Sequence, residues 1–391
     1  MKVKLMLLVC LLTSMNIIAQ KVNFIDNNWN EARAKAAAEN KLLFVDAYTD
    51  WCYWCKVMDK KTFPDAGVIK LMNENFVSLK LEMERDYGVN VSMKYRVTGF
   101  PSFLVFASDG SLLYKTSGYQ EVEAFKTFLS SALANENLER REGVTKEVEL
   151  NFPQFYKNAF GKSNQRKKPE SVTVQQYLAG EKDLFSEVNF SVISKFTSLL
   201  SSAQTDEFVG NISSYERLFG KTEVEAVSGN IGSLKIQTAE KNNSKTEFEA
   251  AVDFFKKHTS DFTPKDENYM RIGFNKNTGN WTAFARLVDK FNADEKPDAN
   301  TVNSWAWDVY EKCDDKAVLA KAIIWSEAVI KQKSEYPLLD TYAALLYKAG
   351  RKKDAEKAAI NAIETGKKEG ADTKETVELM KKFGSKVPAE K

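Results

Sequence analysis

Two cysteines three residues apart, Cys52 and Cys55, have the residue type and spacing that could do chemistry in this sequence. They stand in the segment DAYTDWCYWCK, residues 46–56, where aromatic residues surround them. Such a pair can help to bind a metal ion, can staple the chain as a structural disulfide, or can cycle between a dithiol and a disulfide. The rest of the sequence distinguishes between these three uses.

Metal and haem sites are disfavoured because further ligands are scarce. A structural zinc ion takes four Cys or His ligands, but the chain has a single histidine, His258, far from the pair in sequence. Attachment of a c-type haem needs a histidine directly after the second cysteine, where this sequence has Lys56. We therefore predict no metal ion, and no cofactor other than a redox-active Cys52–Cys55 disulfide.

A redox role suits the local structure that we expect around the pair. Residues 42–48, LLFVDAY, form a nearly unbroken apolar run, typical of a strand buried on both faces, and a helix should start at the cysteines. Free N–H groups and the helix dipole favour a thiolate at that end. We expect Cys52 to be half exposed and to attack a substrate disulfide. Cys55, one turn further along, would resolve the mixed disulfide.

Residues 21–135 have the pattern of alternating helices and strands. Helices are expected over residues 28–41 and 122–133, and a strand over residues 76–81. Residues 102–107 and the following SLLYKTSG segment should form a hairpin, because Asp109 and Gly110 stand at the turn between them. This alternation predicts an α/β sheet.

The sequence after about residue 140 favours helices alone. Ser244 and Glu247 form an N-terminal capping pattern for a helix over residues 244–258, and apolar residues then recur at helical spacing. Residues 338–364 resemble a tetratricopeptide repeat, with a weaker copy before them. We expect an all-helical region at 145–300, tetratricopeptide-like repeats at 301–370 and a C-terminal helix or tail at 371–391.

The N-terminus has the pattern of a secretory signal over residues 1–19. Two lysines precede a wholly apolar stretch, residues 5–12, and Ala19 offers a small residue at a cleavage point. That stretch is too short for a bilayer span, and Cys10 lacks the small residue before it that a lipoprotein needs. We therefore expect an exported protein that acts in the periplasm, with Cys313 as an isolated buried thiol. The net charge of +2 gives no reason to expect nucleic acid as a partner.

Several motifs in order make residues 20–138 resemble a thioredoxin-like domain. The segments are FVDAYTDWCYWCK, KKTFPDAGVIKLMNENFVSLKLE, YRVTGFPSFLVF and DGSLLYKTSGY. They are most similar to the periplasmic branch that includes the C-terminal domain of the transmembrane thiol–disulfide reductase DsbD. The fold expected for the chain is therefore an α/β thioredoxin fold followed by an all-α, tetratricopeptide-like domain.

The resemblance assigns roles to the matching positions. It implies that Cys52 is the nucleophile and Cys55 the resolving thiol, with Trp51 packed beside them. It also implies a cis peptide bond at Pro101, facing the disulfide. The residues expected to contact substrate are Trp51, Tyr53, Trp54, Phe100 and Ser102.

Two carboxylates are candidates for moving the proton of Cys55. Asp46 stands inside the apolar strand run, where burial should raise the pKa of its carboxyl group. The family has an acid at this position. Asp59 lies one helical turn beyond Cys55, where the most similar branch also tends to carry an acid, so we expect it to be a second relay group or a surface charge.

The leading hypothesis is an exported thiol–disulfide oxidoreductase, acting as a reductase or isomerase on proteins with disulfides. Tyr53 and Trp54 replace the histidine-containing pairs of strong oxidants, which favours a reductant. Such a reductant would draw electrons from a membrane donor of the DsbD type, and its helical half would dock a peptide or protein. The alternative is a periplasmic scaffold or chaperone in which the thioredoxin-like domain mainly binds. A thiol peroxidase fits less well, because no Arg or Thr flanks Cys52.

Overall fold

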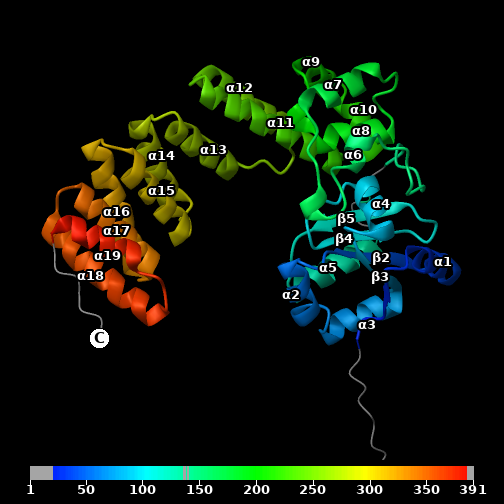
Figure 1. Cartoon of the computed structure of the whole chain (residues 1–391), viewed down its shortest axis with the longest axis horizontal. Helices are drawn as coiled ribbons and strands as arrows, with labels where there is room; N and C mark the ends of the chain where they lie inside the picture. The colour runs from blue at the N-terminus through cyan, green and yellow to red at the C-terminus, as the bar shows by residue number, and fades with distance from the viewer. Residues whose placement is uncertain (1–20, 135–137, 139–140, 385–391) are drawn as a thin grey trace, which may run out of the picture. The chain divides into compact units, whose positions relative to one another are not determined.

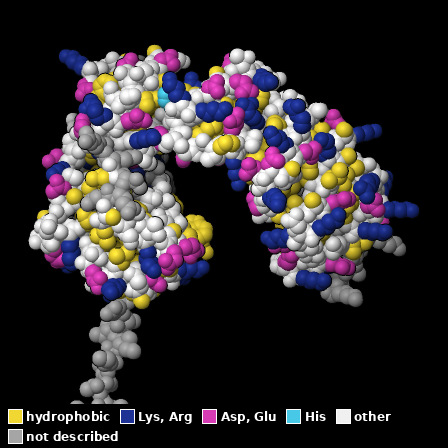
Figure 2. Space-filling view, turned by 180° about the vertical axis from the view of Figure 1, so that it is seen from behind, with side chains coloured by type: hydrophobic (Ala, Val, Ile, Leu, Met, Phe, Trp, Pro, Cys, Tyr) yellow, Lys and Arg dark blue, Asp and Glu magenta, His cyan; other side chains and the backbone are white. Residues whose placement is uncertain are grey.

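The computed structural model describes residues 21–134, 138 and 141–384, so the expected signal segment 1–19, with Cys10 and Ala19, lies outside the described residues. The chain divides into two compact units, one up to Ile231 and one from Gly232 onwards. Neither limit coincides with the domain boundaries expected at 138 and 300, which stay predictions. On the face shown in Figure 2, basic and acidic side chains are interspersed within each unit.

The first unit contains one five-stranded sheet (Figure 1). Its strands lie in the order β1-β3-β2-β4-β5, with β1, β2 and β3 parallel and β4 and β5 each antiparallel to the strand before it in that order. The strands are β1 (Phe24–Asp26), β2 (Leu42–Tyr48), β3 (Phe76–Glu82), β4 (Ser102–Phe106) and β5 (Leu112–Ser117). The apolar run of residues 42–48 is therefore the central strand, buried on both faces as predicted.

Helices cover both faces of this sheet. Residues of α1 (Trp29–Glu39) and α4 (Asp86–Tyr95) share an apolar core with Leu43 and Val45 of β2. Phe44, which points the other way, packs with residues of α2 (Tyr53–Lys61), α3 (Ala66–Asn75) and α5 (Val122–Leu133). The result is a three-layer α/β domain in which the second layer of helices includes the one that follows the cysteines.

The predicted hairpin is present between β4 and β5. The Asp109 carboxylate accepts a hydrogen bond from the N–H of Ser111, and Gly110 has a φ of 93°. This positive φ favours glycine at the turn, and a Cβ there would also push aside the guanidinium of Arg33. The sequence analysis missed two elements, β1 and α4.

A helical region continues the first unit beyond the α/β domain. Its helices are α6 (Gln154–Lys157), α7 (Ser171–Gly180), α8 (Glu187–Lys195), α9 (Ser202–Gly210), α10 (Ile212–Phe219) and the first part of α11 (Lys221–Lys241). Charged side chains join it to the sheet domain. Lys94 of α4 lies 2.6 Å from Glu187 of α8, and Arg96 lies 3.0 Å from Glu223 of α11.

The second unit consists of helices in every part that the structure describes. They are the rest of α11, α12 (Lys245–His258), α13 (Pro264–Asn277), α14 (Trp281–Asp294), α15 (Ala299–Lys312), α16 (Lys316–Gln332), α17 (Tyr336–Lys348), α18 (Lys352–Glu369) and α19 (Lys374–Phe383). Successive helices pack against one another, as α17 does with α18. The all-helical prediction is confirmed, while the assignment to tetratricopeptide repeats stays a prediction.

Two expectations from the sequence concern details of the second unit. Ser244 caps α12 by accepting a hydrogen bond from the N–H of Glu247. The Glu247 carboxylate binds the amide of Asn242 instead of returning to Ser244, so only half of the expected capping box forms. Cys313 is buried at the end of α15 as expected.

Replacing Glu187 by alanine should destabilise the first unit, because it strands the fully buried ammonium of Lys94. Breaking one side of a buried ion pair costs roughly 3–5 kcal/mol. Urea unfolding of the first unit measures the loss. The matched control is Glu142→Ala, which breaks an exposed pair with Arg217 and should cost less than about 1 kcal/mol. Equal losses of unfolding free energy in Glu187→Ala and Glu142→Ala would show that the buried ion pair contributes no more than the exposed one.

Candidate active site

The two cysteines lie at the first turn of α2, directly after the central strand. Cys52 is the N-cap residue of α2, and a disulfide joins it to Cys55 with the Cα atoms 5.3 Å apart. The N–H of Cys55 donates a hydrogen bond to Sγ of Cys52 at 3.0 Å. In the reduced protein the same N–H group would stabilise a thiolate on Cys52.

The expectation that Cys52 is half exposed is wrong for this state. Only 3% of Cys52 and 4% of Cys55 are accessible. The Cys52 sulfur is turned toward the helix, where it is bonded to Cys55 and accepts that residue's N–H, so little of it reaches the surface. A substrate therefore has to approach through the residues that surround the disulfide.

Aromatic side chains form a rim beside the disulfide, which we call the aromatic rim. Trp51, Tyr53 and Trp54 are 57%, 69% and 51% exposed, which is unusual for side chains of this size. Trp51 contacts Phe100 edge to face, with ring centroids 5.9 Å apart. Trp54 lies 5.2 Å from the ring of Tyr119, a residue that the sequence analysis missed. Four of the five predicted substrate-contact residues thus lie around the cysteines with part of their surface open. Trp51, Tyr53 and Trp54 are exposed, and Phe100 is half-buried.

The fifth such residue, Ser102, begins β4 directly after the loop that carries Pro101. The Phe100–Pro101 peptide bond is cis. Ser102 is buried, and its hydroxyl donates a hydrogen bond to the carbonyl of Gly99 at 2.8 Å. The N–H of Gly118 binds the carbonyl of Pro101 at 2.8 Å. The Ser102 hydroxyl is therefore used to hold the loop, and the parts of the loop that lie open are Thr98 and Gly99.

Asp46 is buried in the central strand, on the face that α2 covers. Its residue is 1% exposed, and burial raises the pKa of its carboxyl group to about 7, against the opposing effect of Lys80. Asp46 and Lys80 are direct neighbours in the β2–β3 register, with Nζ 3.8 Å from Oδ2. The other carboxylate oxygen, Oδ1, has no hydrogen-bond partner among the described residues.

Lys80 links the two candidate relay carboxylates. Its ammonium group forms an ion pair with Asp59 of α2 and lies near Asp46. Asp59 has a side chain that is 42% exposed, so the three groups lead from the buried strand to solvent. The sequence analysis missed Lys80. The alternation of residues 76–81 contained the signal, because it pairs Lys80 with Asp46 once β3 is placed beside β2.

Neither a metal cluster nor a membrane-crossing helix was found in the described chain. Among residues 21–134, 138 and 141–384, no group of three or more His, Cys, Asp or Glu side chains is placed to hold a metal ion. Within the same ranges, no helix has the length and apolarity that crossing a bilayer requires.

The strand order, with the central strand running into a disulfide at the start of α2, defines residues 21–134 as a thioredoxin-like domain, of the class that contains the thiol–disulfide oxidoreductases. Within that class, residues 13–125 match the family model Thioredox_DsbH, described as "Protein of unknown function, DUF255".

Similar proteins carry DsbD names. The "Thiol:disulfide interchange protein DsbD" of Colwellia psychrerythraea is 37% identical over 102 residues, covering 25% of this chain and 17% of that protein. The protein of that name in Pseudoalteromonas atlantica is 27% identical over 111 residues, covering 27% and 19%. The chain thus spans less than a fifth of the length of these relatives.

A solved structure, the C-terminal domain of Neisseria meningitidis DsbD in its oxidised form, is 25% identical to this chain. The match covers 26% of this chain and 90% of that one, with a TM-score of 0.24. The fold assignment rests on the strand order and not on this overlap.

Replacing Asp46 by asparagine should remove a pH dependence of stability. The folded pKa of about 7 lies above the ordinary value near 3.8, so the folded protein holds this proton more tightly than the unfolded chain. Stability from this group is present below about pH 4 and is lost as the pH rises through about 7.

The free energy of unfolding of Asp46→Asn should therefore exceed that of the native protein by on the order of 2–4 kcal/mol at pH 8, with no such gain at pH 4. Urea titrations at both pH values measure the difference. Glu123→Gln is the control, since it removes an exposed carboxylate of α5 and leaves Asp46 and its neighbours Lys80 and Asp59 in place. Parallel pH curves for native protein and Asp46→Asn would refute the assignment.

Proposed function

We propose that the protein is an exported thiol–disulfide oxidoreductase that exchanges its Cys52–Cys55 dithiol with disulfides in substrate proteins, as a reductase or isomerase. The observation that carries the proposal is the disulfide at the N-terminus of α2, on the sheet face that also buries Asp46. The matches to thiol–disulfide interchange proteins support the same class of reaction.

The first step is the attack of the Cys52 thiolate on one sulfur of the substrate disulfide. The substrate S–S bond breaks, a mixed disulfide forms at Cys52, and the other substrate sulfur leaves as a thiolate that takes a proton from water. Free N–H groups at the start of α2 stabilise the attacking thiolate. The aromatic rim holds the substrate over the otherwise covered sulfur.

The second step releases the substrate. Asp46 accepts the proton of the Cys55 thiol, and the Cys55 thiolate attacks Sγ of Cys52, so that the protein becomes the disulfide and the substrate leaves as a dithiol. A carboxyl group with a pKa of about 7 can accept and return a proton near neutral pH. Lys80 and Asp59 give this proton a route toward solvent.

The direction of electron flow proposed here is outward from the protein to the substrate. The residues between the cysteines include no histidine that would further stabilise the reduced form and make a strong oxidant. An exported reductant has to be reduced again, and a membrane donor of the DsbD type would supply the electrons. The signal-like residues 1–19 support export to the periplasm.

The reduction potential of Cys52–Cys55 tests this direction. Equilibration of the purified protein with glutathione or dithiothreitol buffers should give a value near about −270 mV, the figure for thioredoxin. The reduced variant Cys55→Ala should accumulate a mixed disulfide with insulin whose disulfides are intact, because Cys52 can attack and no resolving thiol follows, whereas Cys52→Ala should not. A potential near about −120 mV would make the protein a donor of disulfides, and a pair that does not cycle would end the enzyme proposal.

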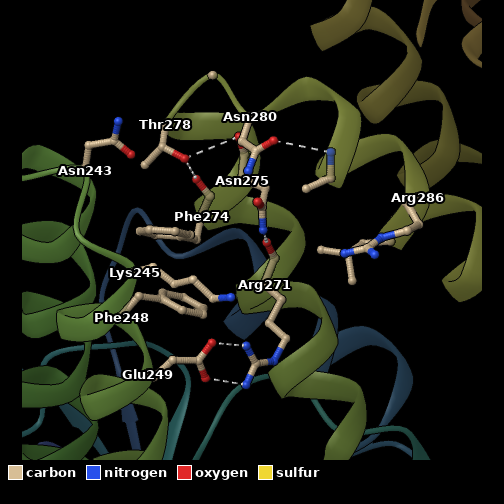
Figure 3. Close-up of a pocket in the computed structure, with 13 residues that line it drawn as sticks. Asn243, Lys245, Phe248, Glu249, Arg271, Phe274, Asn275, Thr278, Asn280 and Arg286 are labelled. Carbon is tan, nitrogen blue, oxygen red and sulfur yellow. Dashed lines mark hydrogen bonds and ion pairs between the residues drawn. The ribbon is translucent and has the colours of Figure 1, made fainter. Parts of the chain in front are cut away.

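The second candidate function is binding of a partner by the second unit. One pocket of that unit is lined by cationic, amide and aromatic side chains. Figure 3 shows this pocket of about 510 Å³ between α12, α13 and α14. The rings of Phe248 and Phe274 stack with centroids 4.3 Å apart, and Arg271 is paired with Glu249. Among the described residues, Lys245 and Arg286 have no ion-pair partner within 4.0 Å. The pocket therefore suits a peptide that carries a carboxylate, as a scaffold or chaperone would bind.

Complementation of a strain that lacks the gene separates the two candidates. Under the enzyme proposal, Cys52→Ala fails to restore the native phenotype, and the double variant Lys245→Glu, Arg286→Glu retains at least partial function. Under the scaffold alternative the order is reversed. Immunoblots check that all variants accumulate to equal levels. Lys245 and Arg286 are exposed, so their replacement should not affect folding, whereas Cys52 is buried and needs this check.

A further inference from the structure

A second cavity lies beside the active-site loop, inside the first unit. Its volume is about 570 Å³, and its walls come from two parts of the chain. Thr98, Gly99 and Ser102, which flank the cis-proline bond, form one side together with residues of β5. Residues of α8 and α11 form the other. We call this space the loop cleft.

The sheet side of the loop cleft offers open backbone. Gly99 is exposed, and a Cβ added to it would meet nothing within 4 Å, so the approach to the loop is unobstructed. β5 is an edge strand of the sheet, and Thr116 and Ser117 near its end line the cleft. An extended polypeptide can lie along such a loop and edge, since both present polar main-chain groups.

The helical side is one face of α11. Thr222, Ala226 and Asn230 recur at intervals of four residues and all line the cleft. Each of the three is exposed. Lys195 at the end of α8 adds an ammonium group over the ring of Phe160, 4.8 Å from its centroid.

A buried ionic network fixes this wall to the sheet domain. Glu223 of α11 forms ion pairs with Arg96 at 3.0 Å and with Lys115 of β5. Burial opposes ionisation of Glu223, but the two cations hold the pKa of its carboxyl group down to about 2. The two sides of the loop cleft are therefore joined by ion pairs inside the first unit, although burial also lowers the pKa of the Lys115 ammonium group.

The charge of the loop cleft is positive. Its ionised side chains are Arg96, Lys115 and Lys195 against the single carboxylate of Glu223, a balance of two positive charges. In the described chain Lys195 has no ion-pair partner within 4.0 Å. An acidic segment of a substrate would thus gain a charge partner without displacing an existing one.

We propose that the loop cleft binds an extended, acidic segment of the substrate next to its reacting cysteine, so that α8 and α11 select the substrate of the thioredoxin-like domain. This inference rests on the proposed disulfide exchange and adds its specificity. The aromatic rim would contact the reacting cysteine of the substrate, and the loop cleft would bind the residues that flank this cysteine.

Exchange rates with three probes test the loop cleft. Two are nonapeptides whose central cysteine is joined to glutathione, one flanked by glutamates and the other by lysines. The third is bis(2-hydroxyethyl) disulfide, which is neutral and too small to span the cleft. The reduced full-length protein should react about tenfold faster with the acidic than with the basic peptide, which corresponds to a single added charge-assisted contact.

Three variants place the effect in the cleft. Lys195→Glu should abolish or reverse the preference for the acidic peptide. Asn230→Trp, which fills the cleft from α11, should slow both peptides at least fivefold and leave the small disulfide unchanged. The control Lys221→Trp puts the same side chain on α11 outside the cleft and should change none of the rates. Circular dichroism melts check that each variant is folded.

The two levels of proposal fail differently. Equal rates for both peptides, or unchanged peptide rates in Lys195→Glu and Asn230→Trp, would overturn the loop cleft while exchange with the small disulfide continues. Absence of exchange with the small disulfide would instead overturn the oxidoreductase proposal, and the specificity with it.

Discussion

The burial of a carboxyl group in the central strand is the constraint on which the active site depends. Asp46 occupies a position that packing alone would give to a hydrophobic residue, between Phe44 and the end of β2. An isolated buried charge is costly, so the strand register has to set Lys80 beside it. That register in turn fixes the end of β2 and the start of α2, where the cysteines lie.

The distance between Lys80 and Asp46 is long for an ion pair, and it influences the pKa of the Asp46 carboxyl group. At 3.8 Å the ammonium group moderates the effect of burial without cancelling it, and its firmer partner is Asp59. The pKa of the Asp46 carboxyl group consequently stays high, near 7. A closer pair would hold the carboxylate ionised, and removal of Lys80 would hold it protonated, so that neither state could both take and return a proton.

Much of the sheet domain could be predicted because its signals are local. The run of residues 42–48 and the helix at 122–133 follow from hydrophobic pattern, and their observed bounds are the same. The turn at Asp109 and Gly110 follows from turn chemistry. β1 was missed because it has three residues, and α4 because its N-cap position, Arg85, makes no side-chain capping bond.

The errors at the site arise from contacts that the sequence does not express. The low exposure of Cys52 depends on the direction of its sulfur, and the place of Tyr119 depends on how the chain returns after β5. Likewise the sequence pattern around Glu187 and Glu223 is that of ordinary surface residues on helices. Only the folded chain shows that their partners are buried cations of the sheet domain.

Those same ion pairs bear on the order in which the protein can be completed. Glu187 follows Lys94 by 93 residues, and Glu223 follows Arg96 by 127. During synthesis the whole thioredoxin-like segment is therefore made before either carboxylate exists. Until then, Lys94 and Arg96 have neither of these ion-pair partners. Cutting the chain near residue 138 would therefore leave Lys94, Arg96 and Lys115 without these counter-charges.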